Sequence, residues 1–366
     1  MARTGDGPVS NGARRALVVG ATGIAGSAVA HHLVDLGWDV WGLSRGTGVI
    51  GRPYRTVSAD LGDIGQLRSV LRGIGITHLF YTSWSRQGTE AENIAVNGAM
   101  LRNVLSAAGE QGGLEHVALL TGLKHYLGPA EAQPVPGTPD TPFLEDEPRL
   151  PVPNFYYAQE DEVLAAAARF GFTWSVHRAH TIIGYAVGNA MNMGLTLAVQ
   201  AAICRENGKP FVFPGSEARW NGLNDMTDAG LLARHMTWAA TTPAAAQDAY
   251  NVVNGDVFRW RSMWGRIADM LGVEDGGTDG ASPLRTQMNT MAAETWSRIA
   301  RKHKLKEHDV SKVASWWHTD GDLGRQREVL ADMRKSRLAG FTGYACTEHA
   351  FRDLFERYRA ASVIPR

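Results

Sequence analysis

A glycine-rich turn near the N-terminus constrains the fold of this chain more than any other feature. Gly20, Gly23 and Gly26 follow the apolar run 16–19 and precede apolar residues at helical spacing. Between a strand and a helix, such a turn lets the backbone approach a pyrophosphate, and the helix N-terminus supplies N–H donors. We therefore expect a dinucleotide site formed by Gly20, Thr22, Gly23, Ile24 and Gly26.

The first half of the chain alternates short apolar runs with helical patterns. Further strands are predicted at 39–44, 78–81, 116–120 and 173–178. This alternation predicts an α/β fold, a Rossmann-type doubly wound parallel sheet. We expect a disordered tail (1–15), a mainly nucleotide-binding domain (16–190) and a smaller, mainly substrate-binding C-terminal portion (191–366), interleaved with the last strands of the sheet.

The second half mixes helices and strands less regularly. Helices are predicted at 191–207, at 258–271 and from an N-cap at Thr227 to about 240, and strands at 211–213 and 249–253. Two stretches rich in Pro, Gly, Asp and Glu, 130–149 and 274–282, are predicted loops.

Composition argues for a small-molecule partner. The 37 basic residues balance the 37 acidic ones, so no electrostatic footprint for nucleic acid or a membrane surface is present. No apolar run is long enough to span a bilayer, and the polar N-terminus lacks a signal-peptide pattern. We expect a cytoplasmic protein with no metal; a homodimer is compatible with the sequence but not required by it.

The residues after the second strand indicate which dinucleotide binds. An NAD enzyme usually carries an acidic residue there, whereas this chain has Ser44 and Arg45. A guanidinium favours a 2′-phosphate, so we expect NADP(H) as the cofactor. Asp60 and Leu61 are candidates for the adenine end, although Asp60 could equally cap the helix that starts at Ile64.

Thr82 and Ser83 follow the strand at 78–81. Strand carboxyl ends face the ligand crevice in open α/β sheets, so both residues are expected to contact the cofactor.

The catalytic pattern departs from the usual one of this fold class. A standard enzyme has Tyr and Lys four residues apart on a helix, and the ammonium lowers the Tyr pKa. Here Glu160 stands four residues after Tyr156, so a lysine must come from elsewhere. Lys124, just beyond the strand at 116–120, is the candidate, and Tyr157 is the alternative tyrosine.

Several longer stretches carry a resemblance to a known family. They read TGLKHYLGP (121–129), PFLED (142–146), NFYYAQED (154–161), TWSVHR (173–178), NVVNGD (251–256) and GFTG (340–343). In this order, they resemble the progesterone 5β-reductase and iridoid synthase-like family, an atypical branch of the extended short-chain dehydrogenase/reductases. The resemblance runs from about residue 16 to residue 365.

The resemblance implies reduction of an activated C=C bond of an enone or enal by NADPH. The family's catalytic tyrosine matches Tyr156, which also contacts the cofactor, and its lysine matches Lys124. Tyr156 would hydrogen-bond the carbonyl oxygen and Lys124 would supply positive charge nearby. The implied substrate is a small apolar molecule with a conjugated carbonyl, steroid-like or terpenoid-like.

Candidate substrate contacts come partly from this match and partly from departures. Trp84 and Phe341 match pocket aromatics of the family, and Asn192 and Met193 begin a helix expected to line the cavity. Ala130 stands where a bulky aromatic is common. His180, followed by Thr181, stands where the family usually has Arg-Pro-Gly, and only Arg45 remains of a frequent Arg-Arg pair.

Three other functions remain open on the sequence alone, the weakest being a sugar-nucleotide epimerase, which normally keeps Tyr and Lys four residues apart. A carbonyl (C=O) reductase or dehydrogenase would use the same Tyr156 and Lys124. A non-catalytic NADP(H)-sensing regulator would bind the cofactor without turnover.

Overall fold

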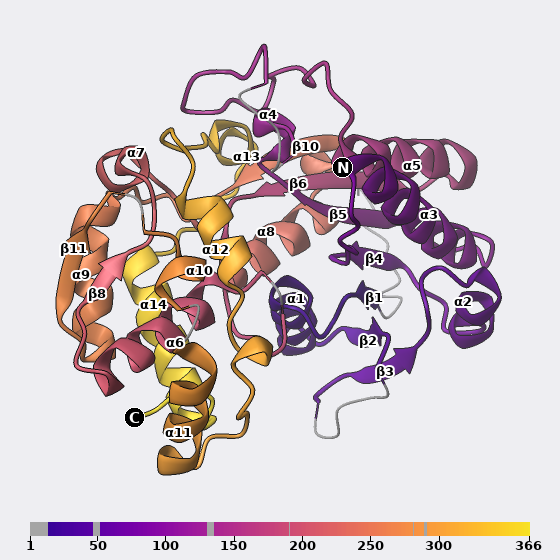
Figure 1. Ribbon diagram of the computed structural model, residues 1–366. Coiled ribbons are helices and arrows are strands. Elements are labelled where there is room, and N and C mark those ends of the chain that lie inside the picture. The colour runs from indigo at the N-terminus through magenta and orange to yellow at the C-terminus, as the bar shows by residue number, and fades with distance from the viewer. Residues whose placement is uncertain (1–13, 47–51, 130–134, 190, 281, 289–290) are drawn as a thin grey trace, which may run out of the picture.

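The computed structural model describes residues 14–46, 52–129, 135–189, 191–280, 282–288 and 291–366. A seven-stranded parallel sheet with the strand order β10–β6–β5–β4–β1–β2–β3 forms its centre (Figure 1). The strands are β1 (Arg15–Val19), β2 (Asp39–Ser44), β3 (Arg55–Ser58), β4 (His78–Tyr81), β5 (His116–Gly122), β6 (Thr173–Ala179) and β10 (Asp248–Val252). The predicted Rossmann-type parallel sheet is confirmed.

Helices cover both faces of the sheet, as the alternating pattern predicts. On one face lie α1 (Ile24–Asp35) and α8 (Ala229–Thr241); on the other lie α2 (Ile64–Leu71), α3 (Glu90–Gly109) and α5 (Phe155–Phe170). Successive residues of a strand point to opposite faces. Ala16 and Val18 of β1 accordingly pack under α1 and α8, whereas Leu17 and Val19 pack on the α2–α3–α5 side.

The C-terminal portion has its own apolar core beside the sheet (Figure 1). It contains α6 (Met193–Glu206), β8 (Phe211–Phe213), α9 (Trp260–Leu271), β11 (Asp275–Thr278), α11 (Ala292–His303) and α14 (Thr347–Ala360). Trp260, Trp264 and Trp296 are fully buried in this core. The Trp264 ring stacks on Phe211 with centroids 4.0 Å apart, which ties α9 to β8.

Short elements complete the chain, and two of them correct the sequence analysis. They are α4 (Lys124–Leu127), β7 (Ile182–Ile183), α7 (Glu217–Asn221), β9 (Thr227–Asp228), α10 (Leu284–Gln287), α12 (Trp316–Leu323), α13 (Arg334–Leu338) and 3₁₀ turns at Pro243–Ala245 and Val310–Lys312. The predicted loop 274–282 contains β11, which pairs with β8. Thr227 is not the cap of α8: it lies in β9, and the Asp228 side chain accepts from the Leu231 N–H instead.

The two portions are not separable along the sequence. Although β10 and α8 belong to the C-terminal half of the chain, they complete one edge and one face of the sheet. Within the described residues, no helix combines the length and the apolar character that a bilayer-spanning segment requires.

A row of buried histidines crosses the sheet from β5 to α8. His116 Nε2 lies 2.9 Å from Ser175 Oγ, which lies 2.9 Å from His177 Nε2, and His177 Nδ1 lies 3.0 Å from His235 Nδ1. Burial lowers the pKa of His116 and of His235 to about 3, and lowers that of His177 well below its usual value. The three imidazoles are therefore neutral in the folded protein at neutral pH.

Acid should destabilise the fold through these histidines. An unfolded chain takes up their protons below about pH 6.5, whereas the folded chain resists protonation down to about pH 3. As the pH falls through that window, each imidazole lowers the free energy of unfolding by up to about 1.4 kcal/mol per pH unit. Urea unfolding at about pH 7.5, 6 and 5 should show a falling midpoint. A midpoint that does not change with pH would contradict the prediction.

Candidate active site

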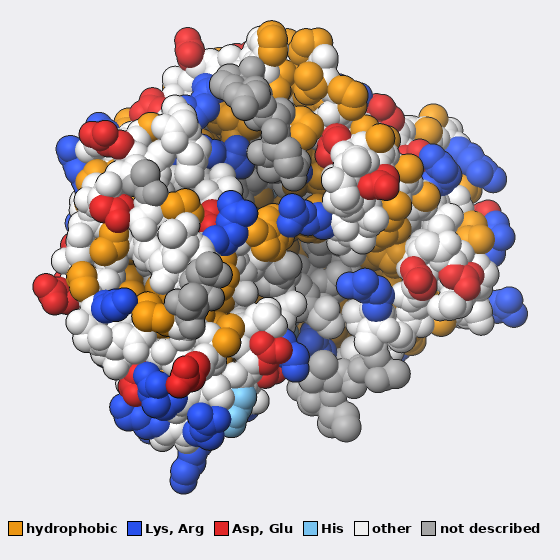
Figure 2. All heavy atoms as spheres, viewed as in Figure 1, with side chains coloured by type: hydrophobic (Ala, Val, Ile, Leu, Met, Phe, Trp, Pro, Cys, Tyr) orange, Lys and Arg blue, Asp and Glu red, His pale blue; other side chains and the backbone are white. Residues whose placement is uncertain are grey.

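A cavity of about 470 Å³ opens where the carboxyl edge of the sheet meets the C-terminal portion. The start of α1, the ends of β4, β5 and β6, and the segment from α12 to Arg325 all contribute to its lining. Figure 2 shows Lys and Arg side chains gathered around the hollow between the two portions. The cavity lies where open α/β sheets place their ligands.

The glycine-rich turn forms the floor of this cavity. Gly20 has a φ of 84°, and its carbonyl accepts from the Gly23 N–H at 2.9 Å. A Cβ on Gly26 would lie 2.2 Å from Gly20 O, so α1 packs against the turn as closely as a backbone can. Gly23 and Ile24 line the cavity, and no side chain caps α1. The uncapped helix start fits the pyrophosphate of a dinucleotide.

Basic groups lie near the turn, at and beyond the end of β2. Ser44 ends β2 and Arg45 is exposed just beyond it. A second guanidinium, which sequence reasoning missed, approaches the turn: Arg52 Nη1 donates to Ala21 O at 2.9 Å and contacts the Tyr54 hydroxyl. Arg52 matches no sequence motif, because it lies well beyond the end of β2, where residues that bind the ribose are expected.

The other predicted cofactor residues follow the strand ends. Thr82 and Ser83 line the cavity, and Thr82 Oγ1 donates to Val19 O at 2.7 Å. Asp60 is exposed and Leu61 is buried beside α2. The alternative role for Asp60 as a helix cap is wrong, because the Asp63 side chain caps α2 by accepting from the Gln66 N–H.

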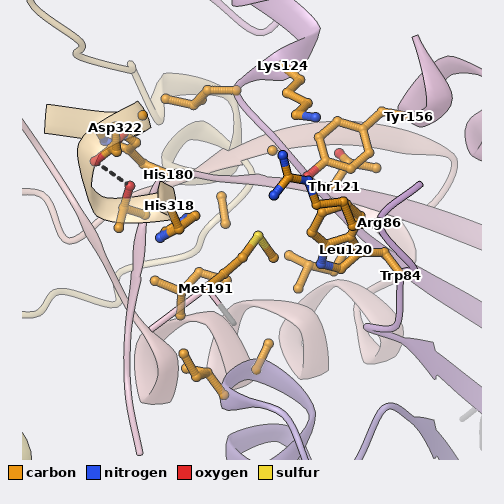
Figure 3. A pocket seen from close by; sticks show the side chains of 18 of the residues that line it. Trp84, Arg86, Leu120, Thr121, Lys124, Tyr156, His180, Met191, His318 and Asp322 are labelled. Carbon is orange, nitrogen blue, oxygen red and sulfur yellow. Dashed lines mark hydrogen bonds and ion pairs between the residues drawn. The ribbon is translucent and has the colours of Figure 1, made fainter. Parts of the chain in front are cut away.

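Tyr156 and Lys124 reach the same cavity from different elements (Figure 3). Asn154 ties these elements together: its Oδ1 accepts from the Tyr156 N–H at 3.0 Å, and its Nδ2 donates to Lys124 O at 2.8 Å. The Lys124 ammonium lies 4.9 Å from the Phe155 ring centroid, within cation–π range. The pair thus lies together although Lys124 is remote from Tyr156 in sequence.

Burial sets the protonation of Tyr156. Burial, with a smaller contribution from the Glu90 carboxylate, raises the pKa of the Tyr156 hydroxyl. The phenol therefore remains a neutral hydrogen-bond donor at physiological pH. A Cβ on Gly122 would lie 3.5 Å from the Tyr156 hydroxyl oxygen, which places that oxygen at the carboxyl end of β5.

Tyr157 does not compete for this role. Its hydroxyl donates to His125 O at 2.6 Å and accepts from the Leu150 N–H at 2.9 Å. Both contacts are to backbone, so Tyr157 holds two segments in place: α4, and the loop that precedes α5. Glu160, which occupies the usual lysine position, is buried in an ion pair with Arg149 at 2.9 Å.

The predicted substrate contacts divide into two groups. Trp84, His180 and Thr181 line the cavity, together with Met191. Three others lie elsewhere, and for these the structure corrects the expectation. Phe341 packs on His235 and Trp238 in the core, Asn192 caps α6, and Met193 is buried in the C-terminal core. Ala130 lies outside the described residues.

His180 belongs to a buried polar wall. Its Nδ1 lies 2.7 Å from Asp225 Oδ1, and its Nε2 lies 3.9 Å from Asp322 Oδ1. Asp322 also accepts from Thr181 Oγ1 at 3.0 Å. Although burial alone raises it, the charges of Arg219 and other nearby basic groups hold the pKa of Asp322 below its usual range.

Sequence reasoning missed most of this wall and most of the charged residues beside it in the cavity lining. Asp225 and Asp322 have no local motif, and only the fold brings them to His180. Other residues that line the cavity without having been predicted include Arg86, Arg285, Trp317, His318, Asp320 and Arg325.

A parallel Rossmann sheet, an uncapped glycine-rich turn, and a Tyr–Lys pair in the adjoining cavity define a nicotinamide-dependent oxidoreductase of the short-chain dehydrogenase/reductase type. Residues 67–365 match the PRISE-like Rossmann-fold domain. The chain belongs to the PRISE-like Rossmann-fold family, and the resemblance found in the sequence is confirmed.

Named relatives cover almost the whole chain. A 3-oxo-Δ4,5-steroid 5β-reductase of Arabidopsis thaliana is 36% identical over 363 residues, with 96% of this chain and 93% of the relative covered. An (S)-8-oxocitronellyl enol synthase of Nepeta racemosa is 37% identical, with 96% and 93% covered. That of Catharanthus roseus is 34% identical, with 96% and 92% covered.

Solved structures share the fold. UDP-glucose 4-epimerase of Brucella ovis in complex with NAD superposes with a TM-score of 0.66 at 16% identity, over 93% of this chain and 97% of that one. The Thermotoga maritima UDP-glucose 4-epimerase has a TM-score of 0.65 at 13% identity, over 94% and 99%.

Proposed function

We propose that this chain is an NADPH-dependent reductase of C=C bonds conjugated to a carbonyl, acting on steroid-like or terpenoid-like enones or enals. The meeting of Tyr156 and Lys124 with the start of α1 in one cavity is the observation that carries the proposal. Relatives named steroid 5β-reductase and 8-oxocitronellyl enol synthase support it.

The residues divide the chemistry between them. Tyr156 donates a hydrogen bond to the substrate carbonyl oxygen, and the Lys124 ammonium stabilises the negative charge that develops there. Trp84, Met191 and Ile182 form apolar walls that hold the ring or chain of the substrate. When bound, the reduced nicotinamide supplies a hydride to the β-carbon of the enone.

Product analysis tests the function. NADPH absorbance should fall with 2-enones and enals, and the products should be saturated carbonyl compounds. Allylic alcohols, or turnover of simple ketones, would instead identify a carbonyl reductase. NADPH binding without turnover on any of these compounds would identify a sensor.

Asn154 should act as a positioning residue for the Tyr–Lys pair. Asn and Ser cap helices about equally well, so N154S should retain the stability of α5, whereas N154A should lose about 1 kcal/mol. Both variants lose the amide N–H that donates to Lys124 O, which a shorter serine side chain does not replace in the same place, and should lower kcat roughly ten- to a hundredfold. Full kcat in a stably folded N154S would contradict this role.

The preference for NADPH is proposed to come from Arg45, with Arg52 nearby. A charge-assisted hydrogen bond contributes about 1.5–3 kcal/mol, so R45A should weaken NADPH binding about ten- to a hundredfold. NADH lacks the 2′-phosphate, and its Kd should not change. Fluorescence titration of both cofactors measures the ratio; equal losses for NADPH and NADH would argue against a 2′-phosphate contact.

A further inference from the structure

We propose that the substrate carries an anionic group, a carboxylate or a phosphate, at the end remote from its conjugated carbonyl, and that Arg285 and Arg325 bind this group. The inference rests on the proposed function and names the substrate class for the same cavity. It departs from the wholly apolar substrate that the sequence resemblance implies.

Charge in the cavity carries the first step. The described residues that line it include four basic side chains, Arg86, Lys124, Arg285 and Arg325, against two acidic ones, Asp320 and Asp322. Arg285 and Arg325 pair with the two acidic side chains, and an apolar substrate end bound against these two guanidiniums would cost part of their hydration. An anionic group on the substrate removes that cost.

Each of the two arginines forms an ion pair with a buried carboxylate. Arg285 Nε lies 3.2 Å from Asp320 Oδ2, and Arg325 Nε lies 3.4 Å from Asp322 Oδ1. The Asp320 and Asp322 side chains are only 4% and 6% exposed. Both ion pairs engage Nε rather than a terminal nitrogen of the guanidinium, and both arginines line the cavity. A planar fork held in this way suits the bidentate binding of a carboxylate or phosphate.

The anchors themselves are fixed. Asp320 also accepts from the Leu284 N–H at 2.6 Å and the Arg285 N–H at 3.1 Å. Asp322 is held by Thr181 and lies 3.8 Å from Arg219 Nη2, a guanidinium buried outside the cavity lining. Arginines preorganised on rigid carboxylates lose little conformational entropy on binding an anion.

The position of the Arg325–Asp322 pair fits the end of a substrate remote from its conjugated carbonyl. Figure 3 shows Asp322, the anchor of Arg325, across the cavity from Tyr156 and Lys124. Apolar side chains that include Leu120 and Met191 also line the cavity. Arg86, which Figure 3 labels beside Tyr156 and Trp84, stacks on Trp317 with its Cζ 3.8 Å from the ring centroid. The cavity therefore suits a molecule with an enone at one end, an apolar body, and an anion at the other end.

A matched set of substrates tests this inference. The set is a 4-en-3-one steroid whose side chain ends in a carboxylate, the methyl ester of the same acid, and the phosphate monoester of the corresponding alcohol. The wild-type kcat/KM should be at least about tenfold higher for the better of the two anions than for the neutral ester. The ranking of carboxylate and phosphate distinguishes the two sources of negative charge.

Variants localise the effect. R285Q and R325Q should each lower kcat/KM for the preferred anion about tenfold or more, and the ratio of this value to that for the ester should fall by a similar factor. R285Q is the safer variant for folding, because the Arg285 side chain is 69% exposed. R298Q is the matched control: it removes an arginine that pairs with Glu206 on the outer surface, and it should change neither value.

The outcomes separate the two proposals. Equal kcat/KM for ester and anions in the wild type, or an anion preference that persists in R285Q and R325Q, overturns the inference and leaves the enone reductase intact. Absence of C=C reduction with every compound overturns the proposed function, and the inference falls with it.

Discussion

Replacing Tyr156 with phenylalanine should lower kcat for enone reduction by about 10²–10³-fold, the usual effect of removing one hydrogen-bond donor to a developing oxyanion. The hydroxyl lies at the carboxyl end of β5 in the cavity that Lys124 also enters. Its raised pKa keeps the proton on the oxygen, so the wild-type rate should not show a Tyr156 ionisation near neutral pH. Steady-state kinetics with a 4-en-3-one steroid measures the loss.

The neighbouring tyrosine provides the matched control. Y157F removes a hydroxyl that bonds only to backbone, at His125 and Leu150, and should cost about 1–3 kcal/mol of unfolding free energy. It should leave kcat within about twofold of the wild type at a temperature where the variant is folded. If Y156F retained full activity while Y157F lost it, the assignment of the donor would be wrong.

Gly26→Ala should abolish tight cofactor binding. The added Cβ would lie 2.2 Å from Gly20 O and 2.7 Å from Thr82 Oγ1, and the first of these is a backbone atom. Either α1 or the turn must move, at a cost of about 1–3 kcal/mol in unfolding free energy. A displaced helix start loses its hold on the pyrophosphate, so the Kd for NADPH should rise about a hundredfold. Calorimetric titration and thermal unfolding measure the two effects.

Gly98 offers a control in an ordinary helix. It lies inside α3, and a Cβ built there meets no atom within 4 Å. G98A should leave the Kd for NADPH unchanged and raise stability by up to about 1 kcal/mol, because alanine favours the helix. Unchanged NADPH binding in G26A would show that the contact between the turn and α1 does not control the cofactor site.

Local patterns predicted the framework of the fold. The predicted strands at 39–44 and 78–81 have the same bounds as β2 and β4, because a short, mainly apolar run favours a buried strand over other elements. β3 was missed because it is an edge strand whose residues, Arg55–Ser58, are largely exposed and polar. β11 was missed because Gly276 and Gly277 give it the composition of a turn.

The candidate site divides in the same way. Thr82, Ser83 and Lys124 could be predicted because they follow strands, and parallel strands end at one edge. Phe341 could not be placed, since an aromatic residue in a loop fits a cavity wall or a core equally well. The acidic wall around His180 depends on contacts between residues far apart in the sequence, such as that of Thr181 with Asp322, which no local pattern encodes.

The late position of β10 in the chain has a consequence for synthesis in the cell. A polypeptide emerging from the ribosome has made about two thirds of its length before Val252, the last residue of this strand, is available. Until then β6 is an open edge, the state most prone to pairing with other nascent chains, and until Thr241 has been made the face that α8 covers is bare as well. The N-terminal half of the chain, which contains the glycine-rich turn, is therefore not a minimal cofactor-binding unit. Exchanging that half between relatives would require β10 and α8 to be exchanged with it.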